Sequence, residues 1–215
     1  MRTNADMVAQ LNRWKTWVIQ CVGAADRFGV APLPNAQLHV LLYLANTLAS
    51  YYSVDPIRGR VLKRGNFPFY PDIQREIDRL AFCGVLSIDK VDYGSRGNIS
   101  ARYSMGMFGE DYLEKLKNSS NEMLLVSRLF EELIGACVDR FLSVQVAIGP
   151  IDANYGANEV LEGEVVDFSE WKNENKNRIV ADYILSRIAE IRPDARRDGV
   201  QLYCGYLDEA LAIYE

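Results

Sequence analysis

The stretch PDIQREIDRLAFCGVLSIDKVDYGSRGNISARYSM, residues 71–105, combines one short helical pattern with two strand patterns, and it decides the fold class. Pro71 suits the first turn of a helix, because its missing N–H would have no partner there in any case. Apolar residues then recur at helical spacing, and Gly84 is placed to end the helix in a left-handed conformation. Two alternating segments, 85–91 and 99–105, flank the turn sequence YGSRGN. The pattern predicts a helix followed by a β-hairpin.

Two longer helices are predicted before this stretch. Residues 5–28 carry apolar side chains at spacings of three and four, which is typical of an amphipathic helix. Residues 36–52, with Asn35 as a possible N-cap, are apolar on nearly every side and predict a central buried helix. Helices followed by a hairpin are typical of a winged helix. We therefore predict an α+β fold, mostly α, with a winged-helix-like domain over residues 1–105.

The second half of the chain, residues 106–215, is predicted to form a helical, acidic domain. Helical patterns cover residues 111–117, 121–142, 175–191 and 200–214. Asn121 is a possible N-cap of the second of these helices, and Leu124 is expected on its apolar stripe. Residues 149–173 are rich in turn formers and acids, which indicates an exposed connection with one short extended piece near residues 164–168. Long irregular loops often contact partners.

Charge divides the chain into two halves of opposite sign. Residues 1–105 carry 13 Lys and Arg against 8 Asp and Glu, whereas residues 106–215 carry 11 against 21. The basic half either faces a polyanion or an acidic partner, or both halves are ordinary solvated surfaces. The segment RGRVLKRGNFPFYP, residues 58–71, predicts a strand or an extended loop with a basic edge. The candidate contact residues lie in this segment and in the hairpin, and they are Arg58, Arg60, Lys63, Arg64, Lys90, Arg96 and Arg102.

The sequence shows no motif for catalysis or for a cofactor. It lacks a Gly-rich phosphate loop, a dinucleotide fingerprint and a nucleophile elbow. His39 is the only histidine, and its apolar neighbours favour a hydrogen-bonded buried residue over a catalytic one. The acids Glu159, Glu162, Glu164 and Asp167 leave a paired-carboxylate enzyme or a metal nuclease open, but no lysine lies near them before Lys172. We expect a protein that is not an enzyme.

The cysteines predict neither a metal site nor a disulfide framework. They stand far apart without a CxxC pair, and each has apolar neighbours, so we expect four buried, reduced thiols at Cys21, Cys83, Cys137 and Cys204. With a single histidine to complete a ligand set, we expect no bound metal and no cofactor.

Sequence-specific DNA reading is not favoured by the predicted second helix of the winged unit. That helix would enter the major groove, and its outward face should offer donors to bases and phosphates. Here it carries Asp72, Glu76 and Asp78 against Arg75 and Arg79. Contact of the basic residues with the DNA backbone stays open, and a protein partner is favoured slightly over it. Trp14, Trp17 and Trp171 would anchor such a partner if exposed, or belong to the core.

The strings LHVLLYLANTLASYY (residues 38–52) and VLKRGNFPFYPDIQREIDRLAFCGVLSI (residues 61–88) resemble small bacterial proteins encoded beside SMC-like or Rad50-like ATPases. These are the middle components of three-component ABC-ATPase systems, including the accessory subunit of Lamassu-type phage defence. The pattern is also loosely similar to the Panacea-type antitoxin domain. The resemblance implies a non-catalytic adaptor that docks on the ATPase and helps to hold an effector nuclease inactive.

A free-standing regulator is the alternative, either a DNA-binding transcription factor or an antitoxin. No run approaches the roughly 18 apolar residues that a membrane span needs, and the first residues lack the apolar block of a signal peptide. We therefore expect a cytoplasmic protein with no membrane partner.

Overall fold

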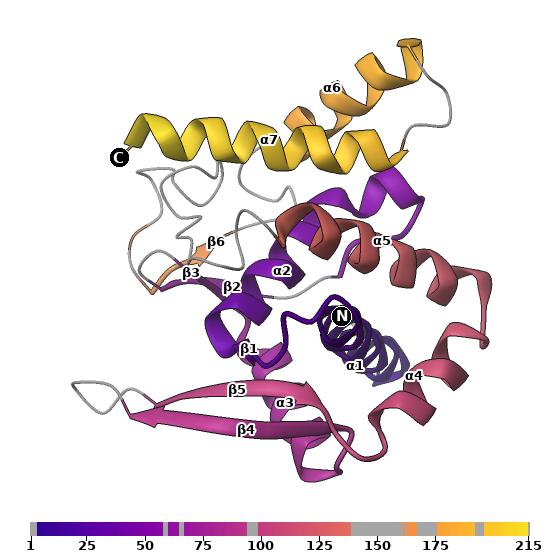
Figure 1. Cartoon of the computed structure of the whole chain (residues 1–215), viewed down its shortest axis with the longest axis vertical. Helices are drawn as coiled ribbons and strands as arrows, with labels where there is room; N and C mark the ends of the chain where they lie inside the picture. The colour runs from indigo at the N-terminus through magenta and orange to yellow at the C-terminus, as the bar shows by residue number, and fades with distance from the viewer. Residues whose placement is uncertain are drawn as a thin grey trace.

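The computed structural model describes residues 4–57, 60–64, 67–93, 99–138, 161, 163–166, 176–191 and 196–214 (Figure 1). The elements run along the chain as α1 (Asn4–Arg27), β1 (Leu33–Pro34), α2 (Asn35–Leu48), the 3-10 helix η1 (Ala49–Tyr52), β2 (Val61–Arg64), β3 (Phe67–Phe69), α3 (Pro71–Phe82), β4 (Leu86–Tyr93), β5 (Ile99–Met105), α4 (Gly109–Lys117), α5 (Asn121–Cys137), β6 (Val165–Val166), α6 (Lys176–Ile191) and α7 (Arg196–Tyr214). The predicted α+β class, mostly α, is confirmed.

The strands form two small antiparallel sheets of three strands each. In the first, β5 lies between β1 and β4; in the second, β2 lies between β3 and β6. The first sheet, with α1, α2 and α3, follows the order expected of a winged helix, and the β2–β3 hairpin is an addition between α2 and α3. The winged-helix interpretation agrees with this order and stays a prediction.

Local signals set the bounds of α3 as the sequence predicts. Pro71 occupies the first turn of the helix, and Gly84 follows its end with a φ of +73°. The turn after α3 then meets the turn that follows β5. Gly106 donates its N–H to the Val85 carbonyl at 2.9 Å, and Phe108 donates its N–H to the Gly84 carbonyl at 3.1 Å. These bonds fix one corner of the molecule, where β4 begins and β5 ends (Figure 1).

Two predicted helix starts are wrong in detail. Asn35 is the first residue of α2 and Pro34 precedes it as the N-cap, so Asn35 does not cap the helix. In α5, Ser120 is the N-cap in place of Asn121, because its hydroxyl accepts the Met123 N–H at 3.2 Å. Leu124 in the first turn of α5 is exposed and is not part of the buried stripe.

The described core crosses the predicted boundary at residue 105. The ring of Trp17 in α1 meets the ring of Phe130 in α5 edge-on, with centroids 5.6 Å apart, and both side chains are buried. Nearly every side chain of α2 is buried as well, which confirms its predicted central place. The division into domains 1–105 and 106–215 stays a prediction. None of the helices in the described ranges has both the length and the apolar character needed to cross a membrane.

Candidate partner-binding surfaces

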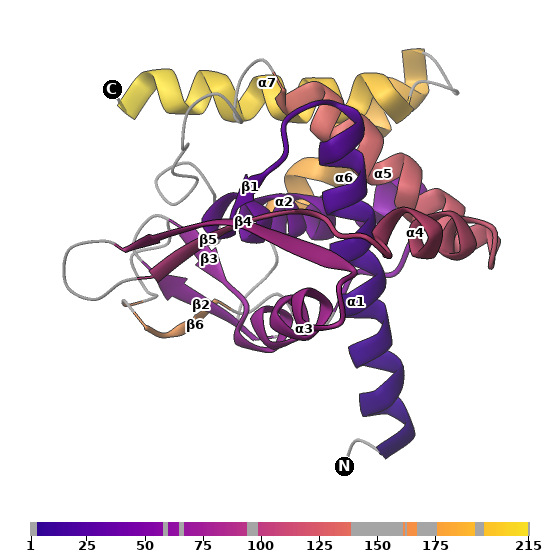
Figure 2. The same cartoon turned by 60° about the horizontal axis from the view of Figure 1, so that its bottom comes forward.

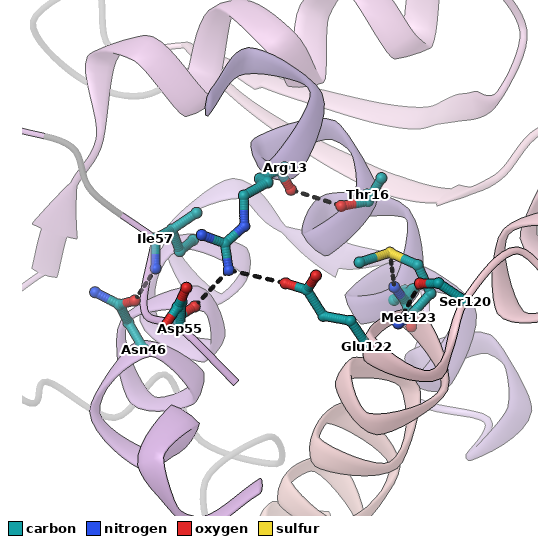
Figure 3. Close-up of polar contacts among 9 residues, drawn as sticks. Arg13, Thr16, Asn46, Asp55, Ile57, Ser120, Glu122 and Met123 are labelled. Carbon is teal, nitrogen blue, oxygen red and sulfur yellow. Dashed lines mark hydrogen bonds and ion pairs between the residues drawn. The ribbon is translucent and has the colours of Figure 1, made fainter. Parts of the chain in front are cut away.

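The segment that leads into β2 is held firmly by α1 and α2. Asn46 in α2 accepts the Ile57 N–H at 2.6 Å through its side-chain oxygen. Arg13 in α1 donates to the Asp55 carbonyl at 2.7 Å and to a carboxylate oxygen of Glu122 at 3.0 Å (Figure 3). Because these contacts come from the core helices, the chain is fixed against the core as far as Ile57.

The basic residues of the predicted edge lie on and before β2. Arg60 and Arg64 are exposed, and Lys63 is half-buried. The Arg64 guanidinium lies over the Phe69 ring, 4.3 Å from its centroid, in a cation–π contact across the β2–β3 hairpin. Arg58 lies outside the described residues. The basic strand therefore exists as predicted, and its use as a contact surface stays a prediction.

The other edge of β2 is covered by β6, from the acidic second half of the chain. Val61 pairs with Val166 and Leu62 with Val165 in antiparallel register. Lys63 donates its N–H to the Glu164 carbonyl at 2.9 Å, and the Lys63 carbonyl accepts the Gly163 N–H at 2.8 Å. The short extended piece predicted near residues 164–168 is thus present as Val165–Val166, and residues 167 and 168 lie outside the described part.

The hairpin cations Lys90 and Arg102 are brought together, and one carboxylate partly offsets their charge. Lys90 and Arg102 stand opposite each other in the β4–β5 register. Asp92 lies 2.8 Å from the Lys90 ammonium and 3.7 Å from the Arg102 guanidinium. The hydrogen bond from Lys90 holds the pKa of Asp92 below its usual value, and the positive charges of Lys90 and Arg102 lower it further. Arg96 lies outside the described residues. The hairpin therefore offers less positive charge than its sequence suggests.

The exposed face of α3 differs from the predicted one. Glu76 does not face outward: its side chain is 0% exposed, because it shares the buried stripe of Ile73 and Ile77. One carboxylate oxygen accepts from Arg79 at 2.5 Å, and the other lies 3.5 Å from the Lys15 ammonium of α1. The outward face keeps Arg75, Arg79 and Asp78, so the predicted excess of acid on this face is wrong.

His39 is a buried, hydrogen-bonded residue, as its neighbours predict. Its Nδ1 accepts the Tyr70 N–H at 3.4 Å, so the ring proton sits on Nε2 and is donated to the side-chain oxygen of Gln74 at 3.0 Å. Burial lowers the pKa of His39 from 6.5 to about 4; the hydrogen bond to Gln74 opposes this shift, and the Arg64 charge adds to it. A neutral imidazole in this place supports the β3–α3 junction.

The cysteines and acids form no recognised centre in the described part of the chain. Cys137 in α5 and Cys204 in α7 are buried with their sulfurs 3.8 Å apart, and Cys21 is buried as well. Cys83 is exposed, so the prediction of four buried thiols is wrong at the end of α3, where the chain turns at the surface. Among the described residues, no group of three His, Cys, Asp or Glu side chains could hold a metal. Of the predicted acid cluster only Glu164 is described.

Sequence reasoning missed a cluster of exposed apolar side chains, which we call the apolar corner: Phe82, Met107, Phe108 and Tyr112. Phe82 is 93% exposed, Met107 83% and Phe108 58%. The corner is held by the hydrogen bonds between the two turns described above and by that from the Tyr112 N–H to the Phe108 carbonyl at 3.2 Å. The apolar string MGMF, residues 105–108 at the end of β5, was a signal for apolar residues here, but not for the meeting of the two turns.

The tryptophans proposed as anchors are not exposed in the part of the chain that the structure describes. Trp14 and Trp17 are buried in the core, as the alternative interpretation predicts, and Trp171 lies outside the described residues. The apolar corner takes their place as the candidate docking surface.

Comparison with known proteins identifies no relative: no protein-family model, no curated protein and no solved structure matches the chain. The function is therefore inferred from the surfaces of the chain itself.

Proposed function

We propose that this chain is a non-catalytic adaptor subunit that binds other proteins in the cytoplasm. Its assembly would be a bacterial antiviral complex, built on an SMC-like or Rad50-like ATPase and an effector nuclease. The apolar corner is the observation that carries the proposal. Single exposed apolar residues are ordinary, but a contiguous group of large ones is typical of a protein–protein interface. Phe, Tyr and Met are also the side chains enriched in such interfaces.

The charges support a protein partner over duplex DNA as the main one. Asp92 pairs with both described cations of the hairpin, and α3 places Asp78 on the face that carries Arg75 and Arg79. Each carboxylate that stays near phosphate opposes the counterion release that drives DNA affinity. Contact of this chain with the DNA backbone inside the assembly would then add to affinity that comes mainly from its contacts with partner proteins.

The ATPase in this proposal rests on the resemblance of residues 38–52 and 61–88 to middle components of three-component systems. Two features support such a subunit: a buried helix α2 at the centre of the unit, and large exposed apolar side chains at the apolar corner. The adaptor would therefore act through contact, with the chemistry supplied by its partners.

The test is affinity purification of the tagged chain from its native host in mild salt, with mass spectrometry of the retained proteins. We expect an SMC-like ATPase and a nuclease with the parental chain, and their loss with the double variant Phe82→Ser/Met107→Ser. Leu202→Ser is the matched control, because it also removes an exposed apolar side chain, 56% exposed, from α7. Equal recovery from both variants would remove the apolar corner from the proposal, and recovery of the chain alone would refute the adaptor function.

A DNA-binding regulator is the second candidate, and the position of Glu76 favours it. With Glu76 inside, the exposed face of α3 carries Arg75 and Arg79 against Asp78, so acids no longer outnumber cations there. A regulator would bind duplex DNA alone with a steep salt dependence. Arg75→Gln/Arg79→Gln should then abolish binding, whereas the adaptor would show weak DNA binding that these changes hardly alter. An antitoxin would instead retain one small toxin and no ATPase.

A further inference from the structure

We infer that the edge of β2 is a docking site for an extended acidic segment of a partner protein, and that β6 occupies this edge as an internal substitute. The inference rests on the proposed adaptor function and adds the chemistry of one partner segment. Strand addition to a sheet edge uses backbone hydrogen bonds for affinity, and side chains for selectivity. The β2–β6 contact has this form, because a distant part of the same chain supplies the added strand (Figure 2).

The contact between β6 and β2 is made by backbone groups. Among the described residues, its register pairs Val61 with Val166 and Leu62 with Val165. Two hydrogen bonds of Lys63 extend the pairing by one residue. Its N–H donates to the Glu164 carbonyl, and its carbonyl accepts the Gly163 N–H. Such bonds can be made by any extended segment with the right register. A partner strand can therefore replace β6 and form the same backbone hydrogen bonds with β2.

The described side chains of the β6 segment add little burial that would hold it in place. Leu161 is 65% exposed, Val165 is 48% exposed, and Glu164 is exposed too. The opposite neighbour, β3, differs: Pro68 is buried, and Phe69 contacts the buried ring of His39 with centroids 5.0 Å apart. The hairpin β2–β3 therefore packs on the core, whereas Leu161, Glu164 and Val165 of the β6 segment bury little apolar surface.

Charge identifies the segment that would replace β6. The receiving strand and its approach carry Arg60, Lys63 and Arg64. The sequence around β6, EVLEGEVVDF over residues 159–168, carries four acids and no base. A partner segment of like composition, extended and acidic, fits the edge, whereas a basic one would be repelled.

Binding of a labelled peptide tests the inference on the full-length chain. The probe is fluorescein-EVLEGEVVDF, and the variant that releases β6 is Gly163→Pro. Proline removes the N–H that bonds the Lys63 carbonyl, and its fixed φ is incompatible with the φ of +82° at Gly163. A Cβ at Gly163 would meet no atom within 4 Å, so the variant acts through the backbone. Val165→Thr is the control, since it changes an exposed side chain and keeps the pairing.

We expect Gly163→Pro to bind the peptide at least tenfold more tightly than the parental chain and Val165→Thr, as measured by fluorescence anisotropy. A peptide with lysine at each acid should not bind. Hydrogen exchange reports the fold of the variant: the Lys63 amide should exchange faster in Gly163→Pro, and added peptide should restore its protection. Equal binding to all three proteins, or binding to none, would overturn the inference. If the ATPase is still retained in that case, the adaptor function survives and only the acidic strand is rejected.

Discussion

The single histidine makes the stability of this protein depend on pH in a way that can be calculated. The pKa of His39 is about 4 in the folded protein, where burial disfavours the charged ring, and about 6.5 in the unfolded chain. The folded pKa is the lower one, so below pH 6.5 the unfolded chain takes up a proton that the folded protein does not. Stability is therefore complete above pH 6.5 and falls as the pH drops from 6.5 toward 4.

The size of the loss follows from the two pKa values. A difference of one pKa unit corresponds to about 1.4 kcal/mol, so His39 alone should remove roughly 2 kcal/mol of unfolding free energy between pH 7.5 and pH 5.0. Urea unfolding at these two pH values measures it, with His39→Gln as the reference. Gln cannot titrate, and the carboxyl groups contribute equally to both proteins. The parental chain should lose roughly 2 kcal/mol more than the variant.

A direct measurement can refute this reasoning. Because the chain has one histidine, the imidazole C2–H signal in a proton NMR titration belongs to His39 without further assignment. Its chemical shift should stay constant from pH 8 to about pH 5 in the folded protein. A midpoint near 6.5, or equal pH dependence of the parental chain and His39→Gln, would show that the ring is accessible to water.

Three further predictions follow from other contacts. Phe130→Ala removes the ring that meets Trp17 and should lower the unfolding free energy by about 3–5 kcal/mol in a single transition seen by circular dichroism and tryptophan fluorescence; two separate transitions would show independent domains. Ellman's reagent should label one of the four thiols natively, and Cys83→Ser should abolish that labelling; reaction of a second thiol would contradict the described burial. Asp92→Asn frees Lys90 and Arg102, so duplex DNA retention should strengthen and its salt slope steepen by up to about 2; an unchanged slope would place the hairpin away from DNA.

Sequence alone predicted the elements whose limits depend on neighbouring residues. Pro71 and Gly84 mark the ends of α3 because their backbone preferences act locally, and the alternation of residues 99–105 gives β5 its exact bounds. The buried state of His39 was also predictable, because apolar residues surround it on its own helix. These features require no knowledge of distant parts of the chain.

The errors arise where a distant residue decides the outcome. Glu76 was placed outward because it is charged, although its spacing from Ile73 and Ile77 puts it on the buried stripe; the Lys15 ammonium, from another helix, makes that burial tolerable. The pairing of Lys90 and Arg102 with Asp92 depends on the β4–β5 register, which sequence spacing alone does not fix. The apolar corner requires two turns 22 residues apart to meet, and local patterns carry no such information.

The opposite charges of the two halves pair in part within the molecule. Arg13 pairs with Glu122 at 3.0 Å, and Arg27 with Glu131 at 2.6 Å, so cations of α1 meet acids of α5. Pairs as exposed as these contribute only about 0–1 kcal/mol each, so they do not hold the halves together as the core does. They do remove cations from the set that could meet phosphate. The charge division, which first suggested a polyanion, is thus partly explained by contact between the halves, and this leaves the exposed apolar corner as the stronger sign of what the protein binds.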